Sequence, residues 1–253
     1  KQKKSLLIEP MKYGIISGGK KIRSTIIFDT GKIFDISEKK LLNICAAVEC
    51  IHSYSLIHDD LPAMDDDDMR RGQPSNHLKF NEATAILAGD AMQALAFETI
   101  ASSKGIIDAH KVEAVRMLAE ACGHKGMIVG QQYDLDAEKN ELLDIELIHS
   151  LKTAKLIQVA LTMPYLGNEM YKKTQVLLSN LGGKLGLAFQ IMDDVLEVSS
   201  DSVILGKSNL SDLTNKKMTY VSVYGLEASI QKAEALSHFC IEQIQENFEI
   251  EKT

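Results

Sequence analysis

Apolar residues recur three and four positions apart along most of the chain, whereas strict alternation of apolar and polar residues is almost absent. This period matches the α-helix, in which such residues gather on one side and can face a core. The pattern therefore predicts an all-α protein. The expected helices cover residues 5–17, 20–35, 38–60, 80–103, 109–128, 141–166, 171–200 and 227–248.

Two segments, residues 41–58 and 181–192, are apolar on most sides, which is typical of helices surrounded by protein. Each leads into an acidic cluster, "DDLPAMDDDD" at residues 59–68 and "DDVLEVSSD" at residues 193–201. The breaks between the expected helices are short, and none resembles a domain linker. We therefore expect a single large helical domain over residues 1–253. Because the first residue is not Met, we also expect some terminal residues to be missing.

Composition and charge narrow the functional classes. A formal net charge of -7 and a pI near 5.5 argue against a nucleic-acid-binding surface, which needs a basic stripe. The four cysteines have no C-x-x-C spacing, so reduced thiols and a cytoplasmic location are expected. No apolar run is long enough to span a membrane.

The two acidic clusters have the spacing of metal-binding carboxylates. Asp193 and Glu197 are four residues apart and therefore face the same side of a helix. Asp59 and Asp65 are six apart, but Pro62 between them should interrupt the helix and let Asp65 return beside Asp59. Carboxylate oxygens suit Mg²⁺ or Ca²⁺, although the positions after Asp65 do not fit an EF-hand loop. Taken alone, the run at residues 65–68 favours a solvated acidic loop, and only Asp65 of this run is predicted as a metal ligand.

Basic residues stand beside several of the expected helix ends. Arg can hold a phosphate through two hydrogen bonds, and Lys meets it as a point charge. Carboxylates for Mg²⁺ together with cations for phosphate indicate a diphosphate ligand. The basic segments are residues 18–23, 70–72, 151–155, 206–208 and 215–219. The window "IISGGKK" is not a nucleotide-binding P-loop, because it lacks the required spacing and preceding strand.

Seven motifs occur in order through most of the chain. They are "MKYGIISGGKKIR", "AAVECIHSYSLIHDDLPAMDDDDMRRG", "AILAGDAMQALAFE", "GQQYDLDAE", "IHSLKTAKLI", "LGLAFQIMDDVLE" and "GKSNLSDLTNKKMTY". In these motifs the chain resembles the trans-isoprenyl diphosphate synthases, and most closely the bacterial farnesyl diphosphate synthases. The resemblance implies helices around a deep central cavity and a homodimer.

The resemblance also implies a reaction and its site residues. Mg²⁺, three ions per active site, would assist the condensation of isopentenyl diphosphate with dimethylallyl or geranyl diphosphate. The implied metal ligands are Asp59, Asp65 and Asp193; the allylic diphosphate site contains Arg70, Lys152, Lys207 and Lys217; the isopentenyl diphosphate site contains Lys20, Arg23, His52 and Arg71; and Thr153 and Gln190 face the carbocation. Asp60, Asp134 and Asp194 would support these groups, with Gln131 a further candidate.

Three further expectations concern single residues. Tyr54, five residues before Asp59, should block extension of the product and favour a C15 chain over a C20 or C10 chain. Ser24 stands where proline is common, and we expect it to affect the local backbone more than the chemistry. His149 is interpreted as a structural or surface residue. The alternatives that remain are a terpene cyclase and a helical partner without catalysis.

Overall fold

The structure is a computed structural model that describes residues 6–16, 18–137, 144–205 and 218–248, with side chains to residue 199 in the third range. Over these ranges it is almost entirely helical, as predicted. None of the described helices combines the length and the apolar character needed to cross a membrane. The chain divides into two compact units. The first comprises Lys1–Ala119 and Ala160–Lys173, and the second comprises Glu120–Val159 and Thr174–Thr253.

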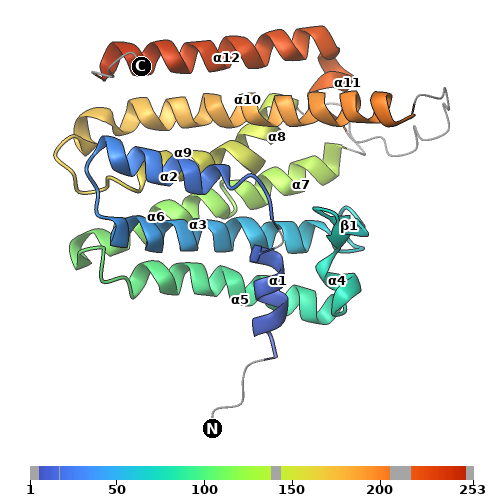
Figure 1. Cartoon of the computed structure of the whole chain (residues 1–253), viewed down its shortest axis with the longest axis horizontal. Helices are drawn as coiled ribbons and strands as arrows, with labels where there is room; N and C mark the ends of the chain where they lie inside the picture. Colours follow the sequence, from blue (N-terminus) through green and yellow to red (C-terminus); the bar gives the residue numbers. More distant parts are fainter. Residues whose placement is uncertain (1–5, 17, 138–143, 206–217, 249–253) are drawn as a thin grey trace. The chain divides into compact units, whose positions relative to one another are not determined.

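The first unit is organised around the long helix α3, Glu38–Asp59. Helix α3 contacts both α2 and α5 and lies between them (Figure 1). Its buried residues, among them Ile44, Glu49 and Cys50, occur on several sides, because neighbours cover more than one face. The remaining elements of this unit are α1 (Ile8–Ile16), α2 (Ile22–Ile33), β1 (Met69–Arg70), β2 (Gln73–Pro74), α4 (Asn76–Lys79), α5 (Glu82–Ala101) and most of α6 (Asp108–Cys122).

Small residues allow α5 to approach α3 closely. Ala85 and Ala88 are fully buried, and Gly89 lies against the imidazole of His58 on α3. A Cβ on Gly89 would stand 2.2 Å from His58 Nε2, which itself lies 3.0 Å from the carbonyl oxygen of Ile86. This close packing fixes the last turns of α3, the part of the helix that leads into the first acidic cluster.

The second unit is built around α10, Tyr171–Leu205, and α12, Leu226–Asn247, which run side by side (Figure 1). A shared core joins Leu187 and Ile191 of α10 to Ala233 of α12 and to Tyr220. The other elements are α7 (Met127–Ala137), α8 (Ile145–His149), a π-helix (Ser150–Ala154), most of α9 (Lys155–Thr162) and α11 (Tyr220–Tyr224).

The predicted helices are present, with differences in their interruptions. The segment expected as one helix over residues 109–128 ends at Cys122, and α7 begins at Met127. The described part of the segment expected over residues 141–166 is broken by the π-helix. The short hairpin of β1 and β2, together with α4 and α11, was not predicted. A two-residue strand or a single helical turn is too short to give a periodic signal.

Candidate active site

The first acidic cluster begins where α3 ends. The helix stops at Asp59, and the chain turns through Pro62 so that the backbone N–H of Asp65 donates to the carbonyl oxygen of Asp59 at 2.9 Å. Asp66, whose φ of 53° lies in the left-handed region, closes the turn by donating to the carbonyl of Leu61. The predicted return of Asp65 to Asp59 is therefore present in the backbone.

Asp60 holds the guanidinium of Arg70. It is only 2% exposed, and its Oδ1 accepts from Arg70 Nε at 2.8 Å and also from Nη2. A second carboxylate, Asp67, accepts from Arg70 Nη2 at 2.9 Å. Burial works to lower the pKa of Arg70, but these bonds and the nearby negative charges outweigh it and raise the pKa. Arg70 is therefore a fixed cation beside the aspartate cluster.

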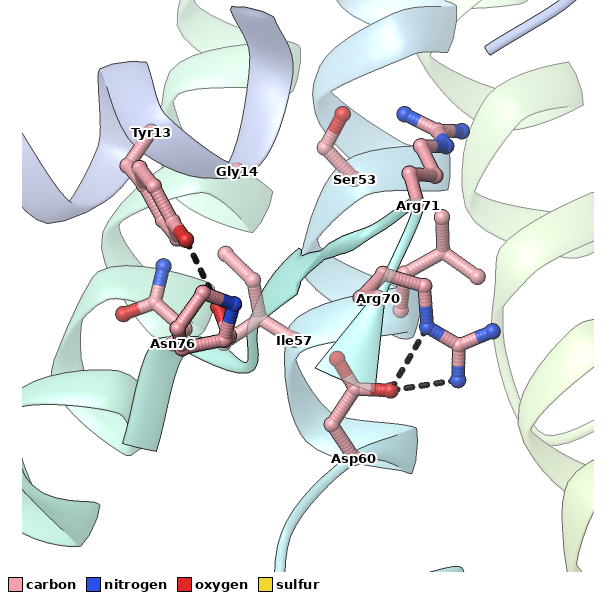
Figure 2. A pocket seen from close by; sticks show the side chains of 10 residues that line it. Tyr13, Gly14, Ser53, Ile57, Asp60, Arg70, Arg71 and Asn76 are labelled. Carbon is pink, nitrogen blue, oxygen red and sulfur yellow. Dashed lines mark hydrogen bonds and ion pairs between the residues drawn. The ribbon is translucent and has the colours of Figure 1, made fainter. Parts of the chain in front are cut away.

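A tight hairpin makes the side chains of the consecutive residues Arg70 and Arg71 point in different directions. Arg70 pairs with Gln73 across the two strands, and the turn residues Arg71 and Gly72 have φ values of 54° and 74°. Positive φ at both central residues defines a type I′ turn, which costs a non-glycine residue such as Arg71 some strain. Figure 2 shows the result beside a pocket lined by α1, α3 and the hairpin: Arg70 points to Asp60, and Arg71 points away from it.

The guanidinium groups of Arg71 and Arg23 both contact the same imidazole nitrogen of His52. His52 Nε2 lies 3.4 Å from Arg23 Nη1 and 3.5 Å from Arg71 Nη2. Because a guanidinium can only donate, Nε2 accepts from both, and the imidazole proton resides on Nδ1. Arg71 also donates to the carbonyl of Gly18 at 2.8 Å. Lys20 is exposed in the same segment, just before α2.

Burial is the main cause of the lowered pKa values of His52 and Arg23. Burial, followed by the positive charges of Arg23, Arg71 and Lys21, holds the pKa of His52 well below its ordinary value. Burial also lowers the pKa of Arg23 to about 10, with Glu49 opposing the shift and Arg71 adding to it. A neutral imidazole thus stands between two cations. Such a concentration of positive charge is suited to an anionic ligand.

In the second unit, the π-helix carries Lys152 and Thr153. π-helical turns are rare and occur frequently at functional sites. Lys152 Nζ donates to Asp134 Oδ2 at 2.5 Å, and Thr153 Oγ1 donates to Gln190 Oε1 at 2.7 Å. Because its proton is used in this bond, the lone pairs of Thr153 Oγ1 remain available to an electron-poor centre. Thr153 and Gln190, which the resemblance assigns to the same carbocation, are thus hydrogen-bonded neighbours.

The neighbouring residues Asp193 and Asp194 of the second acidic cluster differ in their exposure to solvent. Asp193 and Glu197 are both exposed on α10, whereas Asp194 is buried. Asp194 accepts from Tyr220 N at 2.7 Å and from His149 Nε2 at 3.1 Å. Burial works to raise the pKa of Asp194, but the bonds from His149, Tyr220 and Gln190 outweigh it and lower the pKa.

Sequence reasoning missed three features of these sites. His149, expected to be a structural or surface residue, is buried and hydrogen-bonds to Asp194, a partner that the sequence did not indicate. The sequence did not indicate a partner for Ser24, whose hydroxyl donates to the buried Glu49. Glu49 could have been found from the sequence. It is a charged residue within the apolar segment 41–58, and a buried charged residue almost always has a partner. The predicted residues Lys207 and Lys217 lie outside the described residues.

The carboxylates of the two clusters suit Mg²⁺ in their chemistry, because hard oxygen donors are its preferred ligands. Among the residues that the structure describes, no three metal-ligating side chains are gathered into one preformed group. This is compatible with Mg²⁺, which commonly takes only one or two carboxylates and completes its octahedron with water and phosphate oxygens.

Comparison with known proteins gives consistent matches over nearly the whole chain. A model of the polyprenyl synthetase family matches residues 4–252. The farnesyl diphosphate synthase of Escherichia coli is 45% identical over 235 residues, covering 91% of this chain and 79% of the relative. Among solved structures, an FPP/GFPP synthase from Zymomonas mobilis aligns with a TM-score of 0.83 at 36% identity, covering 94% of this chain and 82% of the other.

A geranyltransferase from Helicobacter pylori, solved in complex with magnesium and isoprenyl diphosphate, also aligns with a TM-score of 0.83. It is 31% identical, and the alignment covers 97% of this chain and 83% of the other. Both solved structures agree with the helical fold predicted from the sequence.

Proposed function

Because the chain belongs to the polyprenyl synthetase family, we propose that it is a prenyltransferase that makes farnesyl diphosphate. It condenses isopentenyl diphosphate head-to-tail with dimethylallyl or geranyl diphosphate. The whole chain, residues 1–253, acts as one polyprenyl synthase domain. The family resemblance supports a homodimer, and the absence of paired cysteine motifs supports a cytoplasmic location.

The observation that carries the proposal is the cation cluster of Arg23, His52 and Arg71. Two guanidiniums converge on a neutral imidazole, and the exposed Lys20 precedes them in the chain. A diphosphate carries several negative charges and can accept from both guanidiniums. We assign this cluster to isopentenyl diphosphate, since the resemblance matches all four residues to that ligand.

The allylic diphosphate is assigned to the groups around the aspartate motifs. Arg70, oriented by Asp60, and Lys152, oriented by Asp134, supply positive charge. Lys207 and Lys217 are assigned to the same ligand on the resemblance alone. Asp59, Asp65 and Asp193 would hold Mg²⁺, proposed as three ions. The metal ions would supply electrostatic stabilisation of the departing diphosphate.

The residues of this chain then guide an ionisation, a condensation and an elimination. The allylic carbon–oxygen bond breaks, and its electron pair leaves with the diphosphate. Thr153 and Gln190 present oxygen atoms to the resulting cation. The double bond of isopentenyl diphosphate supplies the electron pair for the new carbon–carbon bond, and the proton lost afterwards passes to the released diphosphate. No side-chain nucleophile takes part.

The test is incubation of the purified protein with Mg²⁺, geranyl diphosphate and labelled isopentenyl diphosphate, followed by chromatography of the products. We expect a labelled C15 product. A predominant C20 product, or a C10 product that accumulates when dimethylallyl diphosphate replaces geranyl diphosphate, would contradict the chain-length assignment but keep the reaction class. Consumption of the allylic substrate without uptake of label would favour a terpene cyclase. Absence of diphosphate release would favour a helical partner without catalysis.

A further inference from the structure

Glu49 is a buried carboxylate to which the resemblance assigns no role. It lies on α3 three residues before His52 and is 7% exposed. Both carboxylate oxygens have partners in α2 or in the residue just before it. Oε1 accepts from Ser24 Oγ at 2.6 Å, and Oε2 accepts from Lys21 Nζ at 3.1 Å. A buried charge is costly unless it is paired, and these two bonds satisfy it.

The two partners of Glu49 fix the beginning of α2. Lys21 is the N-cap residue, with φ of 49° in the left-handed region, and its Nζ also donates to the carbonyl of Ile15 at 3.0 Å. Ser24 additionally lies 3.1 Å from the Sγ of Cys45 on α3. The first turn of α2 is therefore tied to α3 through Glu49 and Cys45, and to the end of α1 through Lys21.

Arg23 lies between these two tethered residues. Residues 21 and 24 are three apart and share one side of the helix, so Glu49 contacts one side of the first turn. The guanidinium of Arg23 reaches His52, the residue one turn beyond Glu49 on α3. A change at Glu49 would release the backbone that carries Arg23 without removing Arg23 itself.

We infer that Glu49 is a positioning residue for the isopentenyl diphosphate site, acting through Lys21 and Ser24 on the placement of Arg23. The inference rests on the proposed function, because it takes Arg23, His52 and Arg71 as the binding groups. The charge of Glu49 also favours the cationic forms of Arg23 and Arg71. Glu49 thus supports both the position and the charge of the cluster.

The experiment compares steady-state kinetics of Glu49→Gln with those of the native chain, varying each substrate while the other is saturating. Glutamine keeps the size of the side chain and an acceptor for Ser24 but removes the charge that holds Lys21. We expect KM for isopentenyl diphosphate to rise about 10-fold, the effect of losing one hydrogen bond to a charged group. KM for geranyl diphosphate and kcat should change less than about 2-fold, well below that effect.

A second test variant and a matched control complete the experiment. Ser24→Ala removes one donor to Glu49 from a half-buried position and should raise the same KM by about 3-fold, less than Glu49→Gln, because Lys21 still pairs with the carboxylate. The matched control is Glu38→Gln, an exposed acid in the first turn of the same helix, which should leave both KM values unchanged. If Glu49→Gln does not fold, Ser24→Ala alone decides the question.

The variant Arg23→Gln tests the assignment of the binding site separately from the positioning role of Glu49. If it leaves KM for isopentenyl diphosphate unchanged, the assigned binding site is wrong. If it raises this KM while Glu49→Gln and Ser24→Ala do not, the positioning role is wrong and the site assignment stands. Equal increases in both KM values for Glu49→Gln, together with a lowered Tm, would indicate a general structural role and overturn the inference.

Discussion

At the scale of single residues, the cations around His52 determine its protonation state. Arg23 and Arg71 both donate to Nε2, and protonation of that nitrogen would remove both acceptor interactions and add a third positive charge. The folded protein therefore favours the neutral imidazole, and the pKa of His52 is well below its ordinary value. A neutral acceptor can hold two guanidiniums close together without adding to their repulsion.

This shift predicts a dependence of stability on pH. Below an ordinary histidine pKa of about 6.5, the unfolded chain binds a proton at His52 that the folded protein does not bind. The free energy of unfolding therefore falls as the pH decreases below this value, by up to about 1.4 kcal/mol per pH unit for this group. In His52→Gln this contribution is absent. Urea denaturation at several pH values between 7.5 and 5 should show a steeper loss for the native chain; parallel curves would contradict the assignment.

Tyr54 leads to a prediction about the product. It is 5% exposed on α3, five residues before Asp59, and its ring meets that of His58 edge-on at 5.8 Å between centroids. If its ring limits the growth of the product, Tyr54→Ala should shift the main product from C15 to C20 or longer. Ser55→Ala, at the partly exposed neighbouring position, serves as the control and should keep C15. Chromatography of labelled products measures both; a C15 product from Tyr54→Ala would exclude this role.

At the scale of elements, the sequence predicted the helices better than their interruptions. Apolar periodicity located α3 and α10 because each buries residues along its length. The break at Pro62 was also predictable, because proline cannot donate the next helical hydrogen bond. The π-helix at Ser150–Ala154 was not, since the same apolar pattern fits an α-helix and only one extra residue per turn distinguishes them.

The site was predictable to a similar extent. Recognisable motifs identified the residues that are proposed to bind a ligand, such as Arg70 and Asp59. Residues that orient them, including Glu49 and His149, carry no motif of their own in a single sequence. Their roles depend on contacts between segments far apart in the chain, such as Asp194 with His149 and Tyr220. Three-dimensional placement was needed to find these contacts.

The π-helix depends on a close approach by α7, which gives a prediction for Gly130. A Cβ there would lie 2.3 Å from the backbone nitrogen of Lys152, which cannot move aside as a flexible side chain can. We expect Gly130→Ala to lower the free energy of unfolding by about 1–3 kcal/mol, as overpacking does, and to reduce kcat by displacing Lys152. The measurements are urea denaturation and steady-state kinetics.

Gly183→Ala is the matched control for this substitution. Gly183 is also helical, but its added Cβ would meet only the end of the Gln158 side chain, at 3.0 Å. The gain in helix propensity of about 1 kcal/mol should offset the small adjustment, so stability should be nearly unchanged or increased. Equal losses in the two variants would mean that the approach of α7 to the π-helix has no special importance.

At the scale of the whole molecule, the charges are distributed unevenly. The chain carries a net charge of -7, yet Arg23, Arg70 and Arg71 are concentrated around the end of α3 and the start of α2. Attraction of a diphosphate therefore depends on a local field, which salt screens over a Debye length of about 8 Å at physiological ionic strength. The metal ions of the proposed function would add positive charge where the aspartates lie.

The proposed metal ligands are Asp59 and Asp65 of the first acidic cluster and Asp193 of the second. Because Mg²⁺ takes few carboxylates and fills its shell with phosphate oxygens, we expect it to bind well only together with a diphosphate. Saturating Mg²⁺ with inorganic pyrophosphate should therefore raise Tm by about 5–10 °C, the shift expected at 100 times Kd for a chain of this size. Either component alone should give a much smaller shift.

Asp59→Asn and Asp193→Asn should each lose most of this thermal shift, because a neutral amide is a poor ligand for Mg²⁺. Asp66→Asn is the matched control: Asp66 belongs to the same acidic run, but no metal role is assigned to it, and asparagine tolerates its left-handed backbone. It should keep the shift. Loss of the shift in Asp66→Asn, or its retention in Asp193→Asn, would mean that other carboxylates hold the metal. Excess EDTA should abolish the shift in every variant that retains it, which separates metal-dependent binding from binding of pyrophosphate to the arginines alone.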